Sequence, residues 1–167
     1  MTTTPKVAVI GLGNIGKTIA HNLVKGNRPV ILTSKTLADA ISFATELGNL
    51  ATARETKDAI HDADIIVMSV WFNTQHELFE QYSTELNGKI IIDPSNPIAP
   101  DEHGGFKKII GEKESAGQLN AVLLPAGASL VKVFGTLGAA SLDNAAFQSP
   151  EKSVLFYATD QAHTESV

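Results

Sequence analysis

The stretch Val-Ala-Val-Ile-Gly-Leu-Gly-Asn-Ile-Gly, residues 7–16, decides the fold, because it sets a Gly-x-Gly-x-x-Gly turn between a strand and a helix. Its first four residues form the apolar run of a buried strand, and residues 15–24 repeat apolar side chains at helical spacing. Gly11 permits a tight turn, Gly13 lets a pyrophosphate approach the backbone, and Gly16 lets the helix pack closely on the strand. The N–H groups of the helix start then face an anion. The stretch predicts a dinucleotide site; the alternative is a glycine-rich turn in an α/β domain that binds no nucleotide.

Short apolar runs alternate with helical patterns along the rest of the chain. The expected strands span residues 7–10, 30–32, 50–53, 65–70, 90–92, 130–134 and 154–157, and the expected helices span residues 15–24, 37–47, 74–86 and 119–123. A capping box of Thr74 and Glu77 is expected to begin the third helix, and Asp160 to begin another near the end of the chain. Nearly continuous apolar strands suit a sheet covered on both faces. The order predicts an α/β fold with a doubly wound, mostly parallel sheet, the NAD(P)-binding Rossmann fold.

Length and composition favour one globular domain: the chain has 167 residues, of which 43% are apolar and 19% charged. It has no cysteine, which excludes disulfides, thiolate catalysis and thiolate zinc sites and fits a reducing compartment. Residues 1–5 do not resemble a signal peptide, and no apolar run reaches the ~20 residues of a membrane span. The net charge of −5 argues against nucleic acid as a partner. We therefore expect a cytoplasmic protein with no membrane or nucleic-acid partner.

The end of the second expected strand indicates which dinucleotide binds. An NAD-specific site usually has Asp or Glu there, whereas this chain has Thr33-Ser34-Lys35 and no acidic residue before Asp39. The same N-terminal segment carries five cations, which favours a local anion site, or arises by chance in a short window. A hydroxyl and an ammonium group suit the 2′-phosphate of NADP. The other interpretation is that Ser34 or Thr36 only caps the following helix.

Three further strand ends should meet the nicotinamide end of the site, because ligands bind at the carboxyl ends of the strands. Trp71, the only tryptophan, either borders the nicotinamide or packs against a helix. Asn96 either presents its amide to a ligand or belongs to a stiff turn in which Asp93 is the local acceptor. Lys132 in an apolar strand indicates an edge, a partner or the crevice. Gly135 either leaves room for a flat ring or only shapes a turn.

No group of residues predicts acid–base, nucleophilic or metal chemistry. The five histidines are scattered without metal-ligand spacing. The run from Asp101 to His103 is more typical of a solvated loop than of a metal site. Ser69, Asp93 and His103 lack the Gly-x-Ser-x-Gly turn of a hydrolase. We predict no catalytic residue and no metal, which suits hydride transfer, because that reaction mainly needs two aligned rings and the exclusion of water.

Together these motifs resemble the NADP oxidoreductases that depend on the deazaflavin coenzyme F(420), whose fold is shared by the cytosolic domains of membrane ferric reductases. The matching pieces are the glycine turn, Thr33-Ser34-Lys35, Ser69-Val70-Trp71, residues 92–97, Ser115-Ala116 and residues 130–136. In that family the turn and the second strand bind NADP, and the later strand ends line the hydride-transfer crevice. The resemblance implies that the cofactor-binding residues are Gly11, Leu12, Gly13, Asn14, Ile15, Thr33, Ser34, Lys35, Ser69, Val70, Trp71, Asn96, Pro97 and Gly135.

The chain departs from that family at two places. Many relatives have Asn where this chain has Gly135, so a side chain that would help seat the second ligand is absent. Relatives also continue past the position of Val167 with helices that commonly build a dimer and close the deazaflavin site. We expect residues 1–167 to form a single dinucleotide-binding domain and the protein to form a homodimer. At the C-terminal end, we expect either that a short helix beginning at Asp160 closes the sheet or that a helical segment is missing after Val167.

The resemblance implies an enzyme, an NADP(H)-dependent oxidoreductase that transfers a hydride between NADPH and a small-molecule acceptor, either the deazaflavin F(420) or a flavin, FMN or FAD. One alternative is the nucleotide domain of a two-domain dehydrogenase for a small carbonyl or imine. Another is a non-catalytic module that senses NADP, since a fold does not determine its function.

Overall fold

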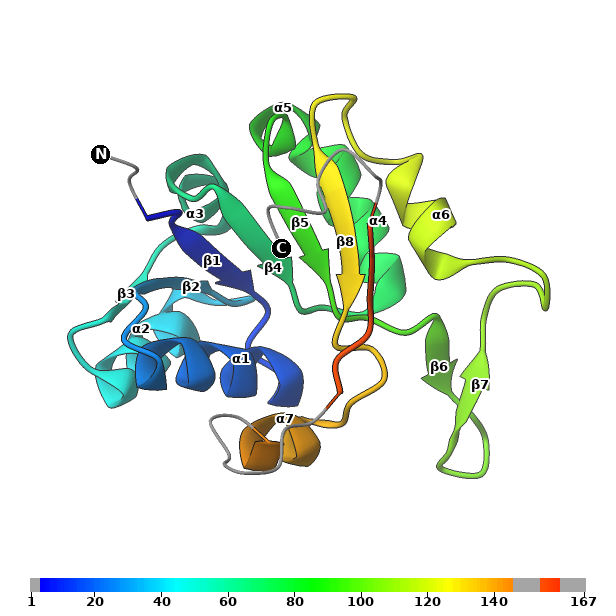
Figure 1. Cartoon of the computed structure of the whole chain (residues 1–167), viewed down its shortest axis with the longest axis horizontal. Coiled ribbons are helices and arrows are strands. Elements are labelled where there is room, and N and C mark those ends of the chain that lie inside the picture. The colour runs from blue at the N-terminus through cyan, green and yellow to red at the C-terminus, as the bar shows by residue number, and fades with distance from the viewer. Residues whose placement is uncertain (1–3, 146–153, 160–167) are drawn as a thin grey trace.

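The computed structural model describes residues 4–145 and 154–159, and a seven-stranded sheet runs through its centre (Figure 1). The strands lie in the order β3-β2-β1-β4-β5-β8-β9, and all neighbouring pairs are parallel except β8 and β9. The strand bounds are β1 (Val7–Ile10), β2 (Val30–Thr33), β3 (Ala51–Ala53), β4 (Ile65–Met68), β5 (Ile90–Asp93), β8 (Ser129–Val133) and β9 (Tyr157–Thr159). The order reverses between β1 and β4, where open sheets of this kind bind ligands. The predicted doubly wound, mostly parallel sheet is confirmed.

Helices cover both faces of the sheet (Figure 1). One face carries α1 (Asn14–Lys25) and α2 (Leu37–Leu47), and the other carries α3 (Thr56–Asp62), α4 (Phe72–Gln81) and α5 (Ser83–Leu86). Two shorter helices come later in the chain: α6 (Ala116–Ala121) contacts β8, and α7 (Ala139–Ala145) contacts α1. In the described part of the chain, no helix has the length and apolar character that crossing a membrane requires.

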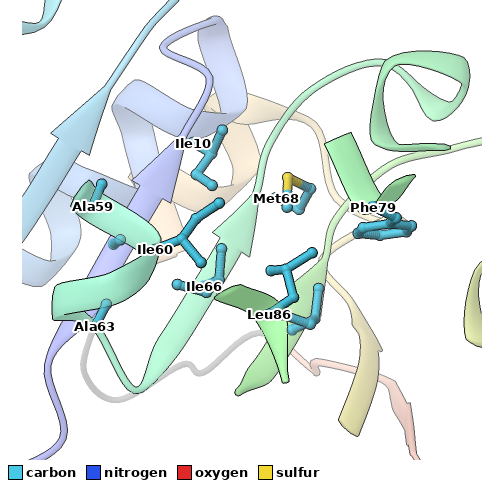
Figure 2. Close-up of a cluster of buried hydrophobic side chains, with 10 residues drawn as sticks. Ile10, Ala59, Ile60, Ala63, Ile66, Met68, Phe79 and Leu86 are labelled. Atoms are coloured by element: carbon cyan, nitrogen blue, oxygen red, sulfur yellow. The ribbon is translucent and has the colours of Figure 1, made fainter. Parts of the chain in front are cut away.

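The core consists of two apolar clusters, one on each face of the sheet. Ala8 and Ile10 of β1 belong to the cluster under α3, α4 and α5, which includes Ile60 and Phe79 (Figure 2). Val9, between them in the sequence, belongs to the cluster under α1 and α2. All four residues of β1 are buried because both faces of the strand are covered. Each large side chain buried in this way contributes about 1.5–3 kcal/mol.

The sequence prediction was wrong about the start of one helix. The helix expected to begin with a capping box at Thr74 begins instead at Phe72, and it is divided into α4 and α5. Phe72 and Gln75 are both buried, and the Gln75 N–H already donates to the carbonyl of Trp71 at 2.9 Å, so the helix has begun where Thr74 would have been the cap. Tertiary packing here outweighs the local capping preference. The expected cap at Asp160 lies outside the described residues.

The strand predicted at residues 154–157 lies a little later, at β9, while α3 and α7 were not predicted at all. Nor was the hairpin of β6 (Ile98–Pro100) and β7 (Phe106–Lys108), whose connection contains the run from Asp101 to His103 that was interpreted as a solvated loop. It lies to one side of the main sheet (Figure 1). Asp101 forms its turn, because one carboxylate oxygen accepts the backbone N–H groups of His103 and Gly105, each at 2.8 Å.

Candidate functional site

A cavity of about 540 Å³ lies where the order of the strands reverses. It is bordered by the residues that directly follow β1, β2, β4 and β5, so the carboxyl ends of four strands meet there. Its volume falls in the usual range of cofactor sites. The residues that line it are Gly11, Leu12, Gly13, Ile15, Ser34, Lys35, Ser69, Val70, Trp71, Thr74, Pro94, Ser95, Asn96 and Ile98.

The backbone conformation of the glycine turn is fixed by the residues that pack against it. Gly11 has a φ of 91°, and its N–H donates to the carbonyl of Thr33 at 3.0 Å. A Cβ on Gly11 would collide with the Ser69 carbonyl and the Val70 side chain, and one on Gly16 would collide with the Gly11 carbonyl. Packing therefore requires both glycines, as the sequence predicted.

Gly13 differs from the other two glycines of the turn. A Cβ placed on it meets no atom within 4 Å, and the residue borders the cavity. Gly13 is also the N-cap of α1, with no side-chain hydrogen bond to the cap and no acidic residue in the first turn. The N–H groups of that turn have no partners within the helix, and the helix dipole is positive there. The open space beside Gly13 therefore suits an anion approaching the main chain.

At the end of β2, one residue caps the following helix and two others line the cavity. Thr36 is the N-cap of α2 and accepts the backbone N–H of Asp39 at 3.3 Å, so Ser34 is not needed as the cap. Ser34 and the exposed Lys35 line the cavity instead. Thr33 does not line it: the residue is 1% exposed, and its hydroxyl lies 2.9 Å from that of Thr56. Its part in the site is to hold Gly11 through its carbonyl.

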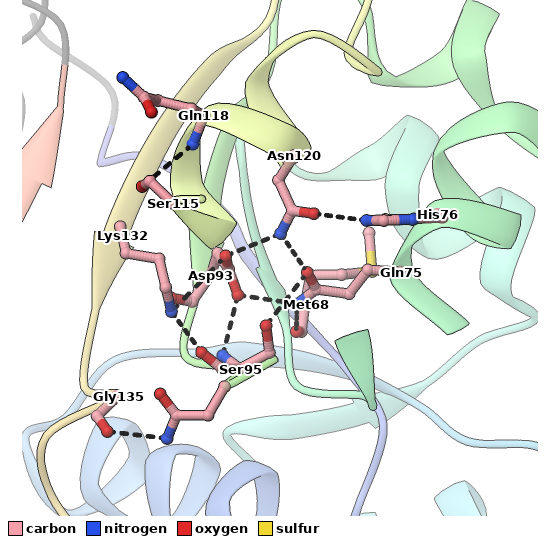
Figure 3. Close-up of polar contacts among 11 residues, drawn as sticks. Met68, Gln75, His76, Asp93, Ser95, Ser115, Gln118, Asn120, Lys132 and Gly135 are labelled. Carbon is pink, nitrogen blue, oxygen red and sulfur yellow. Dashed lines mark hydrogen bonds and ion pairs between the residues drawn. The ribbon is translucent and has the colours of Figure 1, made fainter. Parts of the chain in front are cut away.

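A buried polar network supports the opposite end of the cavity (Figure 3). Asp93, at the end of β5, is fully buried. One of its carboxylate oxygens accepts the Ser95 N–H at 2.8 Å and the Gln75 amide at 2.9 Å, and the other accepts the Asn120 amide at 2.9 Å. The same carboxylate pairs with Lys132 at 3.6 Å. A buried charge is tolerated when it is paired and hydrogen-bonded in this way.

The two amides of the network also bind each other. The Asn120 amide donates to Oε1 of Gln75 at 2.7 Å, while the Gln75 amide also donates to the carbonyl of Met68 at 2.8 Å. His76 lies 2.8 Å from the side-chain oxygen of Asn120. The network thus joins β4, α4, β5 and α6 around one carboxylate, which also holds Ser95 of the cavity lining.

Lys132 holds the main chain at the end of β5. Its ammonium group donates to the carbonyl of Asp93 at 3.2 Å and to the carbonyl of Ser95 (Figure 3). Burial lowers the pKa of Lys132, and the Asp93 carboxylate opposes that shift. The adjacent Asn96 donates its amide to the carbonyl of Gly135 at 2.9 Å. Of the explanations for Lys132, the structure supports a charged partner and excludes an edge strand, because β9 pairs with β8.

The cavity brings most of the predicted cofactor residues together. Asn14, Thr33, Pro97 and Gly135 do not line it, although Gly135 is linked to it through Asn96. The sequence prediction missed Thr74, Pro94, Ser95 and Ile98 in the lining. Pro94 and Ser95 stood within a motif that had been singled out, whereas Ile98 belongs to the unpredicted hairpin. The supporting amides of Gln75 and Asn120 gave no signal, because nothing in a sequence distinguishes a buried amide from an exposed one.

The chain matches one family model and several individual proteins in sequence. Residues 6–97, more than half of the chain, match the model of the family described as NADP oxidoreductase, coenzyme F(420)-dependent. Metalloreductase STEAP3 of Rattus norvegicus is 26% identical over 138 residues, which are 83% of this chain and 26% of that protein. A glutamyl-tRNA reductase of Methanococcus maripaludis is 30% identical over 103 residues, 60% of this chain and 26% of that protein. The chain spans about a quarter of the length of these curated relatives.

Solved structures share the fold. The hypothetical protein SMa0349 of Sinorhizobium meliloti has a TM-score of 0.82 and 27% identity, covering 95% of this chain and 75% of its own. A protein of Arthrobacter sp. fb24, described as a candidate F(420)-dependent NADP reductase, has a TM-score of 0.80 at 20% identity. The match covers 98% of this chain and 77% of that protein. A reductive aminase of Aspergillus terreus in complex with NADPH has a TM-score of 0.60 at 22% identity, and the match covers 83% of this chain and 44% of that protein. On the family match and the shared fold, the chain belongs to the coenzyme F(420)-dependent NADP oxidoreductase family, a family of NADP-dependent oxidoreductases.

Proposed function

We propose that the chain binds NADP(H) across the cavity and transfers a hydride between NADPH and a deazaflavin or flavin acceptor. The observation that carries the proposal is the cavity itself. It joins an uncapped helix N-terminus, a serine and a lysine at one end to an exposed tryptophan at the other, in a chain of this family.

The residues of the first end fit the phosphates of NADP. The open space at Gly13 and the first turn of α1 suit the pyrophosphate, which would accept hydrogen bonds from main-chain N–H groups. Ser34 and Lys35 would hold the 2′-phosphate through charge-assisted hydrogen bonds. Ser69 and Val70 would border the ribose and nicotinamide, because they continue the wall from the glycine turn towards Trp71.

The residues of the second end would align the rings and keep water out. When bound, NADPH would supply a hydride, two electrons with one proton, and the acceptor would take one further proton from solvent. No side chain of this chain needs to exchange a proton in that transfer. Its residues contribute position: Trp71 and Ile98 border the space, and the network around Asp93 fixes Pro94 and Ser95. Small displacements in such a site can cost about 100-fold in rate.

A turnover screen tests this function. The oxidation of NADPH by the purified protein is followed with coenzyme F(420), FMN, FAD, a ferric chelate and small carbonyl and imine compounds as separate acceptors. We expect turnover with F(420) or a flavin. Reduction of carbonyl or imine compounds alone would favour the nucleotide domain of a two-domain dehydrogenase. Tight NADPH binding with no acceptor reduced would favour the sensing module.

The homodimer is a further part of the proposal. Supporting it, the residues at and before β9 expose the apolar side chains of Val154, Phe156 and Tyr157, with exposed fractions of 70%, 70% and 51%. Large exposed apolar patches commonly mark contacts between proteins. Sedimentation equilibrium should give twice the mass of one chain, and a monomer at all concentrations would contradict it.

A further inference from the structure

Two large aromatic side chains are exposed at the mouth of the cavity. Trp71, which lines the cavity, is 56% exposed, and Phe106 of β7 is 61% exposed. Their ring centroids lie 6.3 Å apart with a tilt of 36° between the planes, so they contact each other side by side without stacking face to face. Exposed apolar groups gathered beside a cavity indicate a surface that a ligand covers.

The hairpin presents an apolar face on the same side as Phe106. Residues paired directly across an antiparallel ladder share one face, and the pairs here are Ile98 with Lys108 and Pro100 with Phe106. Ile98 lines the cavity, so this face of the hairpin is the one next to it. Lys107 pairs with Ala99 and belongs to the opposite face.

The one charged residue on that face is used elsewhere. The ammonium group of Lys108 donates to the carbonyls of Gly111 at 2.7 Å and Glu112 at 3.2 Å. What remains towards the cavity is Ile98, Pro100, Phe106 and the neighbouring Trp71. A small carbonyl or imine substrate would leave most of this surface in water. A tricyclic ring would cover it, because such a ring is flat, aromatic and wide enough to touch both aromatic side chains.

We propose that Phe106 and Trp71 form a stacking wall for the tricyclic ring of the hydride acceptor, and that the β6–β7 hairpin thereby selects isoalloxazine and deazaflavin rings over small substrates. This inference rests on the proposed function and deepens it. The wall recognises ring shape, which F(420) and FMN share, so it would accept either source of the ring.

Trp71 is a built-in reporter, because it is the only tryptophan of the chain. The protein is saturated with NADP⁺, so that no hydride is available, and is titrated separately with oxidised FMN and oxidised F(420) while Trp71 emission is recorded. We expect saturable quenching. Phe106→Ala should weaken the affinity about fivefold, and Phe106→Tyr should restore it, because the tyrosine ring keeps the stacking surface. Lys107→Ala, on the opposite face, should bind as the wild type does. NADPH affinity should be unchanged in all three variants.

The outcomes separate the wall from the function. Equal ring affinity in the wild type and Phe106→Ala, or an equal loss in Lys107→Ala, overturns the wall. Quenching by only one of the two compounds keeps the wall, because the groups attached to the shared ring then decide which compound binds, and it identifies that compound as the acceptor. In turnover, wild-type activity with an unchanged acceptor KM in Phe106→Ala also overturns the wall alone. A wild type that oxidises NADPH with neither ring overturns the proposed function.

Discussion

The two ends of the cavity are built in different ways. The phosphate end is one continuous segment, in which Gly11, Gly13 and the first turn of α1 offer main-chain groups. The opposite end is assembled from segments that follow β4 and β5 together with the hairpin, and side chains around the buried Asp93 hold it in place. The first end should be sensitive to added atoms, because a new Cβ occupies ligand space. The second should be sensitive to lost atoms, because each buried polar group depends on its partners.

The largest expected effect is at the phosphate end. Gly13→Val should abolish measurable NADPH binding while the protein stays folded, because its side chain would enter open space that the pyrophosphate needs. Gly138→Val is the matched control, since a Cβ there also meets nothing within 4 Å but the residue does not line the cavity. Calorimetry measures the binding and circular dichroism the fold. Unchanged affinity in a folded Gly13→Val protein would place the phosphates elsewhere.

At the opposite end, removing the central carboxylate should affect stability first. Asp93→Ala should lower the free energy of unfolding by about 3–5 kcal/mol, because it leaves the half-buried Lys132 and the buried Gln75 and Asn120 without their shared partner. Asp143→Ala removes an exposed carboxylate whose contact with His21 is long, at 3.9 Å, and should change little. Urea unfolding compares the two. Equal small effects would mean that the network does not hold this end together.

The sequence predicts the phosphate end of the cavity better than the opposite end, because the phosphate end is built from continuous segments. The glycine turn, Ser34 and Lys35 are contiguous motifs whose local geometry fixes their position, so the sequence predicted them. Thr33, predicted together with them to bind the cofactor, does not line the cavity; its hydroxyl is engaged by Thr56 of α3, a helix that was not predicted.

The second end escaped prediction because its parts are distant in the sequence. Gln75 and Asn120 meet at Asp93 only after α4 and α6 have packed. The hairpin that brings Ile98 to the cavity and Phe106 beside Trp71 consists of two strands of three residues each, too short for a periodic pattern to reveal. Asp93 itself was foreseen only as the acceptor of a turn, which is confirmed by its bond to the Ser95 N–H.

A smaller effect is expected for a variant that changes the positioning of the acceptor without changing the binding of NADPH. A Cβ on Gly135 would lie 3.1 Å from the Asn96 side-chain oxygen and 3.3 Å from the Lys132 ammonium group. Gly135→Leu should therefore shift both groups and the loop that they hold, and lower kcat for acceptor reduction by about 100-fold. NADPH affinity should stay near the wild-type value, because the phosphate end is remote. Gly138→Leu should leave both quantities unchanged; equal turnover in the two variants would make Gly135 a turn residue only.

The smallest expected effect is a pH dependence. Burial holds the pKa of Lys132 below its ordinary value, so between the two values the unfolded chain binds a proton that the folded chain does not. The free energy of unfolding should therefore rise with pH across that alkaline window. Lys132→Met should remove this contribution to the slope, whereas Lys107→Met, which changes an exposed lysine, should retain it. Urea unfolding at a series of alkaline pH values measures the slopes, and identical slopes in all three proteins would contradict the assignment.

The most direct test of the account is a calorimetric titration of NADPH and NADH into the wild type and Lys35→Ala. We expect the wild type to bind NADPH at least about tenfold tighter than NADH, because a charge-assisted contact to the 2′-phosphate adds about 1.5–3 kcal/mol. Lys35→Ala should lose most of that difference while its NADH affinity hardly changes. Equal affinities for the two nucleotides in the wild type would contradict the central claim that this cavity is an NADP site.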